Sequence, residues 1–232
     1  MKRKSGLVAM SLKLLALVVF TPFLGVFLAV VIYRFVPVTD TVFMRRMAQK
    51  NNVEVRQQWV PLSQISASLP LAVVSSEDNL FTKHNGFSWT AIERAYNESK
   101  KGKRTRGGST ISQQTAKNVF LANDPSYVRK AVEVPITAMI ELVWGKERIM
   151  EVYLNIVEFG PGVHGAEAAS QTYFHHPAKN LSSAEAALMA AVMPSPVRFK
   201  LSAPSPYVRR RQAQIQSLMR KIGKVDYHRS DK

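Results

Sequence analysis

The 232-residue chain contains no cysteine. A disulfide framework, a thiolate nucleophile and a cysteine-ligated metal site are therefore all excluded. Its five histidines are scattered without a His-x-x-x-His pair. No set of carboxylates has metal-site spacing either, which argues against zinc. Period-two alternation and internal repeats are also lacking, so the sequence favours helices over strands.

Acidic residues are few, since 16 Asp and Glu stand against 32 Lys and Arg, a net charge of +16. Such an excess of positive charge predicts an anionic partner: nucleic acid, anionic lipid headgroups or a phosphate-bearing substrate. The length suits one domain with an appendage.

The N-terminal region has the pattern of a membrane anchor. A basic tail at residues 1–13 precedes residues 14–33, which carry no charge. A helix of that length spans roughly 30 Å, the thickness of a bilayer's hydrocarbon core. No small-x-small cleavage site follows, so a retained transmembrane helix is expected, with a polar juxtamembrane segment at residues 34–59. Basic residues lie on both sides of the span, so charge bias alone leaves its orientation open.

Residues 60–225 are predicted to form an all-α domain, because apolar residues recur there at helical spacing. Helix starts are indicated by capping residues, two of them in capping boxes with a glutamine or glutamate three residues later. These residues are Ser68, Ser88, Thr110, Ser182 and Ser205.

Prolines and a glycine indicate further helix boundaries. Asp124 followed by Pro125 is typical of a helix start. Pro135 is expected to kink or break that helix just after Glu133. Gly145 should separate it from a helix over residues 146–156.

The first candidate for chemistry is a pair of adjacent carboxylates, Glu77 and Asp78. They follow an apolar run, Leu69–Val74, and precede a polar loop with His84 and Gly86. A carboxylate at a helix end, backed by apolar side chains, can gain the raised pKa of a general base. The alternative is an exposed helix C-terminus, because carboxylates are mostly found at the surface.

The second candidate is a glycine turn at Gly107 and Gly108 that leads into the helix capped by Thr110. Unpaired N–H groups and the helix dipole make such a place suited to phosphate. The spacing is not that of a Walker loop, and a plain capped loop is the alternative. Of the next amides, Gln113 and Gln114, one can face the loop while the other packs or binds.

The third candidate is Arg129 and Glu133, four residues apart on one helix face. A surface ion pair of small energetic value is the simple alternative.

Four blocks in this order resemble the successive motifs of the peptidoglycan glycosyltransferases, which polymerise lipid II into glycan strands. The blocks are Glu77-Asp78-x-x-Phe81-x-x-His84-x-Gly86, Gly108-Ser109-Thr110-x-x-Gln113-Gln114, Arg129-Lys130-x-x-Glu133 and Lys146-x-x-Ile149-x-x-x-Tyr153-Leu154-Asn155. The resemblance covers roughly residues 62–211. No Ser-x-x-Lys or Lys-Thr-Gly of a transpeptidase appears, so the chain is most similar to the monofunctional biosynthetic transglycosylases. The resemblance implies an all-α fold related to lysozyme.

The resemblance also implies roles for individual residues. Glu77 would be the general base, and Glu133 would assist the pyrophosphate or a bound divalent cation (Mg or Mn). Substrate-binding positions would be Asp78, Phe81, His84, Arg94, Ser109, Thr110, Gln113, Gln114, Lys117, Arg129 and Lys130. Structural motif positions would be Gly86, Gly108, Lys146, Tyr153 and Asn155.

Lipid II, the growing lipid-linked glycan, the bilayer and other cell-wall synthesis proteins are the partners that the resemblance implies, without nucleic acid. It places the chain in the bacterial inner membrane, with its N-terminus cytoplasmic and its catalytic domain periplasmic. Moenomycin, an inhibitor that mimics the donor, would bind at the same substrate-binding positions.

Three departures from the family pattern bear on these details. Members often carry an arginine where this chain has Pro125, and Pro135 lies unexpectedly inside the third block's helix. The fifth block, an arginine followed by Val-Leu, survives only as Arg211 and Ile215.

The chemistry separates the alternatives. A sugar hydroxyl is a poor nucleophile that needs a positioned base, whereas a pyrophosphate leaving group needs cations and N–H donors instead of a proton. A glycosidase needs a second carboxylic acid across the bond. Carboxylates set among lysines and arginines therefore favour transfer from a phosphate. A lysozyme-like lytic enzyme and a non-catalytic basic membrane protein are the alternative hypotheses.

Overall fold

The structure, a computed structural model, describes residues 2–100, 108–122 and 126–227, with only part of the side chains of the first and fourth helices. The chain divides into two compact units, Met1–Val36 and Pro37–Lys232. The first unit consists mainly of helix α1, Lys2–Tyr33, which continues through Pro22. Within the described residues, no helix combines the length and apolar character needed to cross a bilayer. The residues of the expected span, 14–33, are helical but are not shown to be membrane-spanning.

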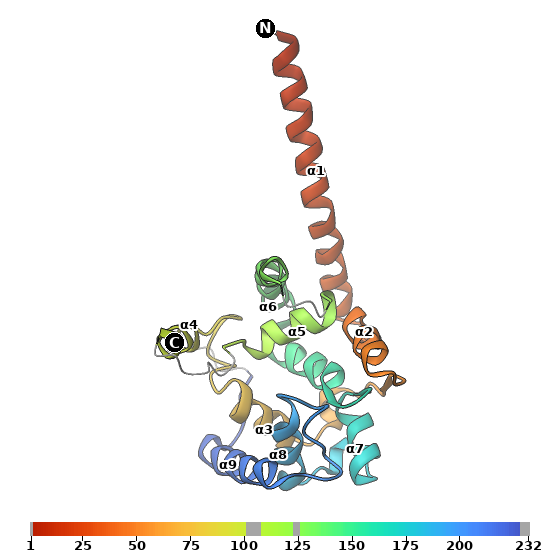
Figure 1. Cartoon of the computed structure of the whole chain (residues 1–232), viewed down its shortest axis with the longest axis vertical. Helices are drawn as coiled ribbons and strands as arrows, with labels where there is room; N and C mark the ends of the chain where they lie inside the picture. The colour runs from red at the N-terminus through yellow and green to blue at the C-terminus, as the bar shows by residue number, and fades with distance from the viewer. Residues whose placement is uncertain (1, 101–107, 123–125, 228–232) are drawn as a thin grey trace. The chain divides into compact units, whose positions relative to one another are not determined.

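The second unit is mostly helical, as predicted. Figure 1 labels its α-helices, α2 Val42–Asn51, α3 Ser68–Glu77, α4 Trp89–Lys100, α5 Ile111–Phe120, α6 Tyr127–Ile156, α7 Ala166–Phe174, α8 Ser183–Val192 and α9 Pro206–Ile222. Two short 3₁₀ turns, η1 Leu62–Gln64 and η2 Ala178–Asn180, lie between them in the sequence. Helix α2 lies in the stretch predicted as juxtamembrane and packs against α5 with Phe43 and Met44 buried.

A small sheet adds to the predicted helices. Its strands are β1 Arg56–Gln57, β2 Glu158–Gly160 and β3 Val163–His164, in the order β1-β3-β2. Strand β3 runs parallel to β1 and antiparallel to β2. Strands this short show no alternation in the sequence, so the pattern could not reveal them.

The core of the second unit has two helical layers that meet near the end of α3. Helix α3 packs on α8 and α9, which Figure 1 shows beside it, and α5 packs on α6. Leu69, Ala72 and Val73 of α3 are fully buried. Alanines on α8, including Ala187 and Ala190, are also buried and have small side chains that let the two helices approach closely. Helix α3, which ends at Glu77, is therefore packed inside the domain.

Helix α6 corrects one prediction. The helix runs through Pro135, and its non-helical residue is Gly145, with φ 73° and ψ 168°. Of the kink or break expected after Glu133, the break is wrong, because a proline removes one backbone hydrogen bond while buried side chains on both sides hold the helix in place. The predicted start at residues 124–125 lies outside the described residues. Ser126 is the N-cap, and its Oγ accepts the Arg129 N–H at 3.1 Å.

Candidate active site

Glu77 is the last residue of α3, and the burial of that helix brings its carboxylate into the domain. Its side chain is 17% exposed. Gln114 Nε2 donates to Glu77 Oε2 at 3.4 Å, and Arg211 Nη2 lies 3.8 Å from Oε1. Burial raises the pKa of Glu77, Arg211 and Gln114 oppose that rise, and the neighbouring Asp78 adds to it. The carboxylate thus has the environment of a general base.

Asp78 and His84 form a hydrogen-bonded pair inside the protein, here called the internal bracket. Asp78 Oδ2 accepts the Ile111 backbone N–H at 3.1 Å, and His84 Nε2 lies 3.0 Å from the same oxygen. The Gly86 N–H donates to His84 Nδ1 at 3.2 Å, so Nε2 is the nitrogen that donates to Asp78. The bracket ties the first sequence block to the start of α5. Both side chains, expected to bind substrate, lie in contacts within the protein.

Helix α5 begins with the predicted capping box. Thr110 Oγ1 accepts the Gln113 N–H at 3.1 Å, and Gln113 Oε1 accepts the Thr110 N–H at 3.0 Å. The Thr110 hydroxyl also donates to the Gly86 carbonyl at 2.6 Å. Gln113 is therefore engaged in capping, which leaves Gln114 as the amide that reaches Glu77.

Position 86 accommodates only glycine without strain. Its φ is +87°, and an added Cβ would lie 2.9 Å from Thr137 Cγ2 and 3.0 Å from Glu141 Cγ. A side chain here would be strained in its backbone and crowded by α6.

Gln114 has a second partner behind it. Tyr153, on the part of α6 that follows Gly145, donates its hydroxyl to Gln114 Oε1 at 2.9 Å. The Tyr153 side chain is fully buried. Burial, together with the charges of Glu77 and Asp78, raises the pKa of the phenol well above its usual range. Tyr153 therefore stays protonated.

A cationic cluster surrounds Glu133, which is 2% exposed. Arg129 Nη1 lies 2.6 Å from Glu133 Oε2, and Lys130 Nζ lies 2.5 Å from Oε1. Lys130 also donates to Ser109 Oγ at 3.2 Å, which joins the glycine turn to α6. Burial lowers the pKa of Lys117 while Glu133 opposes that change. We call Lys117, Arg129, Lys130 and Glu133 the cationic cluster; its positive charges outnumber its one carboxylate.

Two motif residues support the frame of the site. Lys146 pairs with Glu141 at 2.7 Å, and its Nζ lies 4.7 Å from the centre of the Phe81 ring. Asn155 is fully buried and binds the Val60 backbone on both sides, accepting its N–H at 3.0 Å and donating to its carbonyl at 2.9 Å.

Some predicted residues cannot be placed, and one residue was missed. The Arg94 side chain, Gly107 and Pro125 lie outside the described part of the chain, and Gly108 is placed just before the capped turn. Arg211, on α9, lies beside Glu77, although in the sequence it is only the remnant of a weakened block. That remnant was the only signal for it.

Divalent metal would find few ligands here. Among the described residues, no group of three or more His, Asp or Glu side chains could hold an ion. Glu133 has both oxygens in ion pairs, so a cation would have to displace Arg129 or Lys130. The side chains present therefore do not fit a dedicated Mg or Mn site.

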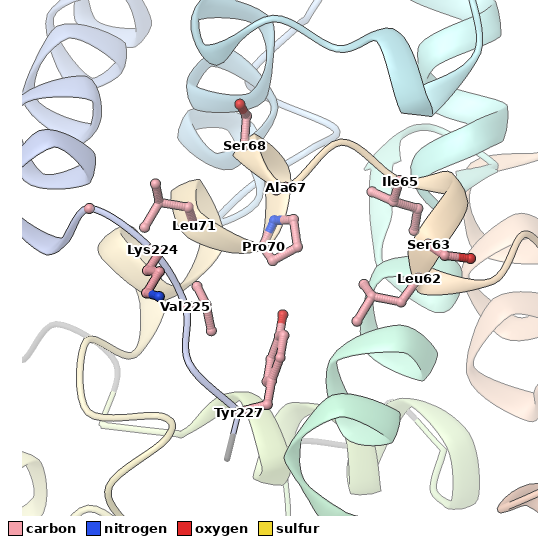
Figure 2. A pocket seen from close by; sticks show the side chains of 11 residues that line it. Leu62, Ser63, Ile65, Ala67, Ser68, Pro70, Leu71, Lys224, Val225 and Tyr227 are labelled. Carbon is pink, nitrogen blue, oxygen red and sulfur yellow. The ribbon is translucent and has the colours of Figure 1, made fainter. Parts of the chain in front are cut away.

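A hollow of about 490 Å³ lies at the opposite end of α3 (Figure 2). It is lined by η1, the start of α3 and the segment after α9, with Tyr227 pointing into it. None of its lining residues is a carboxylate. The Glu77 end of α3 is therefore the candidate active site.

Comparison with known proteins gives consistent results. A family model described as Transglycosylase matches residues 44–220. A biosynthetic peptidoglycan transglycosylase of Pasteurella multocida is 53% identical over 214 residues, 88% of this chain and 86% of the relative. Proteins of the same description from Bacteroides thetaiotaomicron and Haemophilus influenzae are 49% and 48% identical. The first alignment covers 87% of this chain and 84% of the relative, and the second covers 89% and 87%.

Proposed function

Because the chain belongs to the transglycosylase family of peptidoglycan synthesis, we propose that it polymerises lipid II into glycan strands by inverting sugar transfer. It is an enzyme, a peptidoglycan glycosyltransferase that acts in cell-wall biosynthesis. The observation that carries the finer proposal is the part-buried carboxylate of Glu77, joined through helix α5 to the cationic cluster.

In the proposed reaction, Glu77 takes the proton from the 4-hydroxyl of the acceptor sugar. That oxygen attacks C1 of the donor sugar from the face opposite the pyrophosphate, and the C1–O bond to the leaving group breaks. Undecaprenyl pyrophosphate departs with the bonding electrons. A positioned general base of this kind is worth about 10²–10⁴ in rate.

The leaving group is stabilised by charge. Lys117 lies on α5, and Arg129 and Lys130 lie on α6, where Lys130 also contacts Ser109. Ammonium, guanidinium and hydroxyl donors in a partly buried setting are suited to the negative charge that develops on a pyrophosphate. Burial lowers the pKa of Lys117, because a charged ammonium group is less stable away from water. A bound pyrophosphate would stabilise that charge.

A divalent cation is not needed in this scheme for the charge to be met, because the cluster already carries an excess of cationic side chains. No step is assigned to the Mg or Mn that the family resemblance implies. Anchoring through residues 14–33, with the catalytic unit outside the cytoplasm, likewise stays a prediction. Such an anchor suits a substrate whose lipid tail remains in the bilayer. Moenomycin would compete with the donor for the site at Glu77 and the cationic cluster.

Hydrolysis is the second candidate, and the cluster argues against it. A glycosidase needs a second carboxylic acid that protonates the leaving oxygen. Glu133, a second carboxylate near the site, has its two oxygens in ion pairs with Arg129 and Lys130, so neither is placed to give a proton to a leaving oxygen.

The test is polymerisation of purified lipid II by the full chain in detergent or vesicles. Wild type should produce glycan strands, and Glu77→Gln should lose about 99% or more of the rate. Glu147→Gln, an exposed carboxylate on α6, serves as the matched control and should stay active. Release of fragments from finished sacculi without strand growth would overturn the proposal in favour of hydrolysis. Full activity in Glu77→Gln would remove its assigned base.

A further inference from the structure

We propose that Tyr153 is a positioning residue that sets the orientation of the Gln114 amide, so that the amide presents its N–H donor to Glu77. The inference rests on the proposed role of Glu77 as the base. Tyr153 would not touch the substrate; it would act through Gln114 on the carboxylate.

Three side chains from separate elements form the relay. The Tyr153 hydroxyl lies 2.9 Å from Gln114 Oε1, and Gln114 Nε2 lies 3.4 Å from Glu77 Oε2. Tyr153 is on α6, Gln114 on α5 and Glu77 at the end of α3. The phenol is fully buried and Glu77 is 17% exposed, so the relay runs from the core to the site.

The direction of each hydrogen bond follows from the chemistry of its ends. An ionised carboxylate only accepts, so Gln114 must turn its NH₂ group toward Glu77. Its carbonyl oxygen then faces Tyr153, whose hydroxyl has to donate. If the amide were reversed, its oxygen would face the carboxylate and repel it. Without the phenolic donor, nothing at the Tyr153 end selects between the two orientations.

The relay adds to the control that other groups exert on Glu77. Asp78, which directly follows Glu77 after the end of α3, disfavours the ionised form of Glu77, and Arg211 on α9 favours it from 3.8 Å. Gln114 favours ionisation as well. Because Arg211 is beyond hydrogen-bond distance, the Gln114 N–H is the directed donor on Oε2. Losing it should make Glu77 hold its proton more tightly.

The test compares pH profiles of kcat/KM for lipid II polymerisation. In Tyr153→Phe the acid limb should move to higher pH by about half a unit to one unit, the size of one ordinary hydrogen bond, because the Gln114 amide stays in place and loses only its fixed orientation. Gln114→Leu should shift it in the same direction, and adding Tyr153→Phe to Gln114→Leu should cause no further shift. Tyr173→Phe, beside Gly160 and away from the site, is the control and should leave the profile in place.

A direct titration separates this inference from the proposed function. The Glu77 carboxyl, labelled with ¹³C and identified by its loss in Glu77→Gln, should titrate at higher pH in Tyr153→Phe whether or not the protein polymerises lipid II. Lower stability of Tyr153→Phe with an unmoved Glu77 titration would overturn the relay and leave Tyr153 a purely structural residue. An inactive wild type with the titration shift present would overturn the proposed function alone.

Discussion

Asp78 accepts a hydrogen bond at 3.1 Å from the backbone N–H of Ile111, the first residue of α5. The contact joins the residue after Glu77 to the helix that carries Gln114. It also places a negative charge at the N-terminus of α5, where the helix dipole favours one. This hydrogen bond therefore fixes the backbone beside Glu77 relative to the helix that carries Gln114.

Replacing Asp78 tests that hydrogen bond. Asp78→Asn keeps the shape but removes the charge that faces the α5 N-terminus and His84, so the free energy of unfolding should fall by about 1–2 kcal/mol. Urea denaturation measures the change. Asp40→Asn, which breaks the exposed pair with Arg45, is the control and should change stability little. Equal effects of the two substitutions would contradict the assigned role.

Two glycines separate backbone strain from crowding. Gly86 and Gly145 both have positive φ, but an added Cβ would meet α6 at Gly86 and open space at Gly145. Gly145→Ala should cost about 1 kcal/mol of stability from backbone strain, and Gly86→Ala about 2–4 kcal/mol because crowding adds to it. Thermal denaturation checks the order. The reverse order would mean that Thr137 and Glu141 move aside freely.

The raised pKa of Glu77 has a consequence for stability. An acid whose pKa is higher in the folded state holds its proton more tightly there. Folding stability should therefore fall as pH rises from the ordinary glutamate range through the raised pKa. Glu77→Gln cannot ionise, so it should unfold at a higher temperature than wild type near neutral pH and lose that advantage in acid. A variant less stable than wild type at neutral pH would show that the contact with Arg211 outweighs desolvation.

Removing the Glu133 carboxylate should leave the positive side chains of the cationic cluster without their counter-charge. Glu133→Gln leaves Arg129 and Lys130 without their partner; breaking a buried pair of this kind costs about 2–4 kcal/mol, toward the lower figure because Lys130 is 42% exposed. Added pyrophosphate should raise the unfolding temperature of this variant more than that of wild type. Glu147→Gln is the control. An unchanged response to pyrophosphate would argue that the cluster does not bind the leaving group.

Asn155 should matter for stability and little for the chemistry itself. Asn155→Ala would leave the N–H and carbonyl of Val60 without their side-chain partners, which predicts a loss of about 2–3 kcal/mol. Asn180→Ala, an exposed asparagine in η2, should be nearly neutral. Stability is measured by denaturation and activity per folded molecule by lipid II polymerisation. A large loss of activity with normal stability would give Asn155 a direct role.

Local signals predicted the helix starts well. The capping boxes at Thr110 and Ser182 and the cap at Ser205 form as expected, because each depends on residues three positions apart. Ser68 is the exception, since it lies inside α3 after Ala67. The break expected at Pro135 failed because burial along α6 outweighs one missing hydrogen bond.

Long-range contacts were beyond the sequence. Arg211 reaches Glu77 only because α9 packs on α3, and no local pattern carries that information. The sequence predicted that one of Gln113 and Gln114 would face the loop, without saying which. The structure shows that Gln113 caps α5 and Gln114 contacts Glu77. The internal contacts of Asp78 and His84 likewise depend on where α5 begins.

The turn of the backbone at Gly145 makes α6 sensitive to chain length. The segment before it carries Glu133, and the segment after it carries Tyr153. Each residue of an α-helix rotates the chain by about 100°. One inserted or deleted residue between Gly145 and Tyr153 would swing the phenol away from Gln114 while Glu133 stayed where it is. Evolutionary drift in this segment should therefore proceed by substitution and hardly ever by a gap.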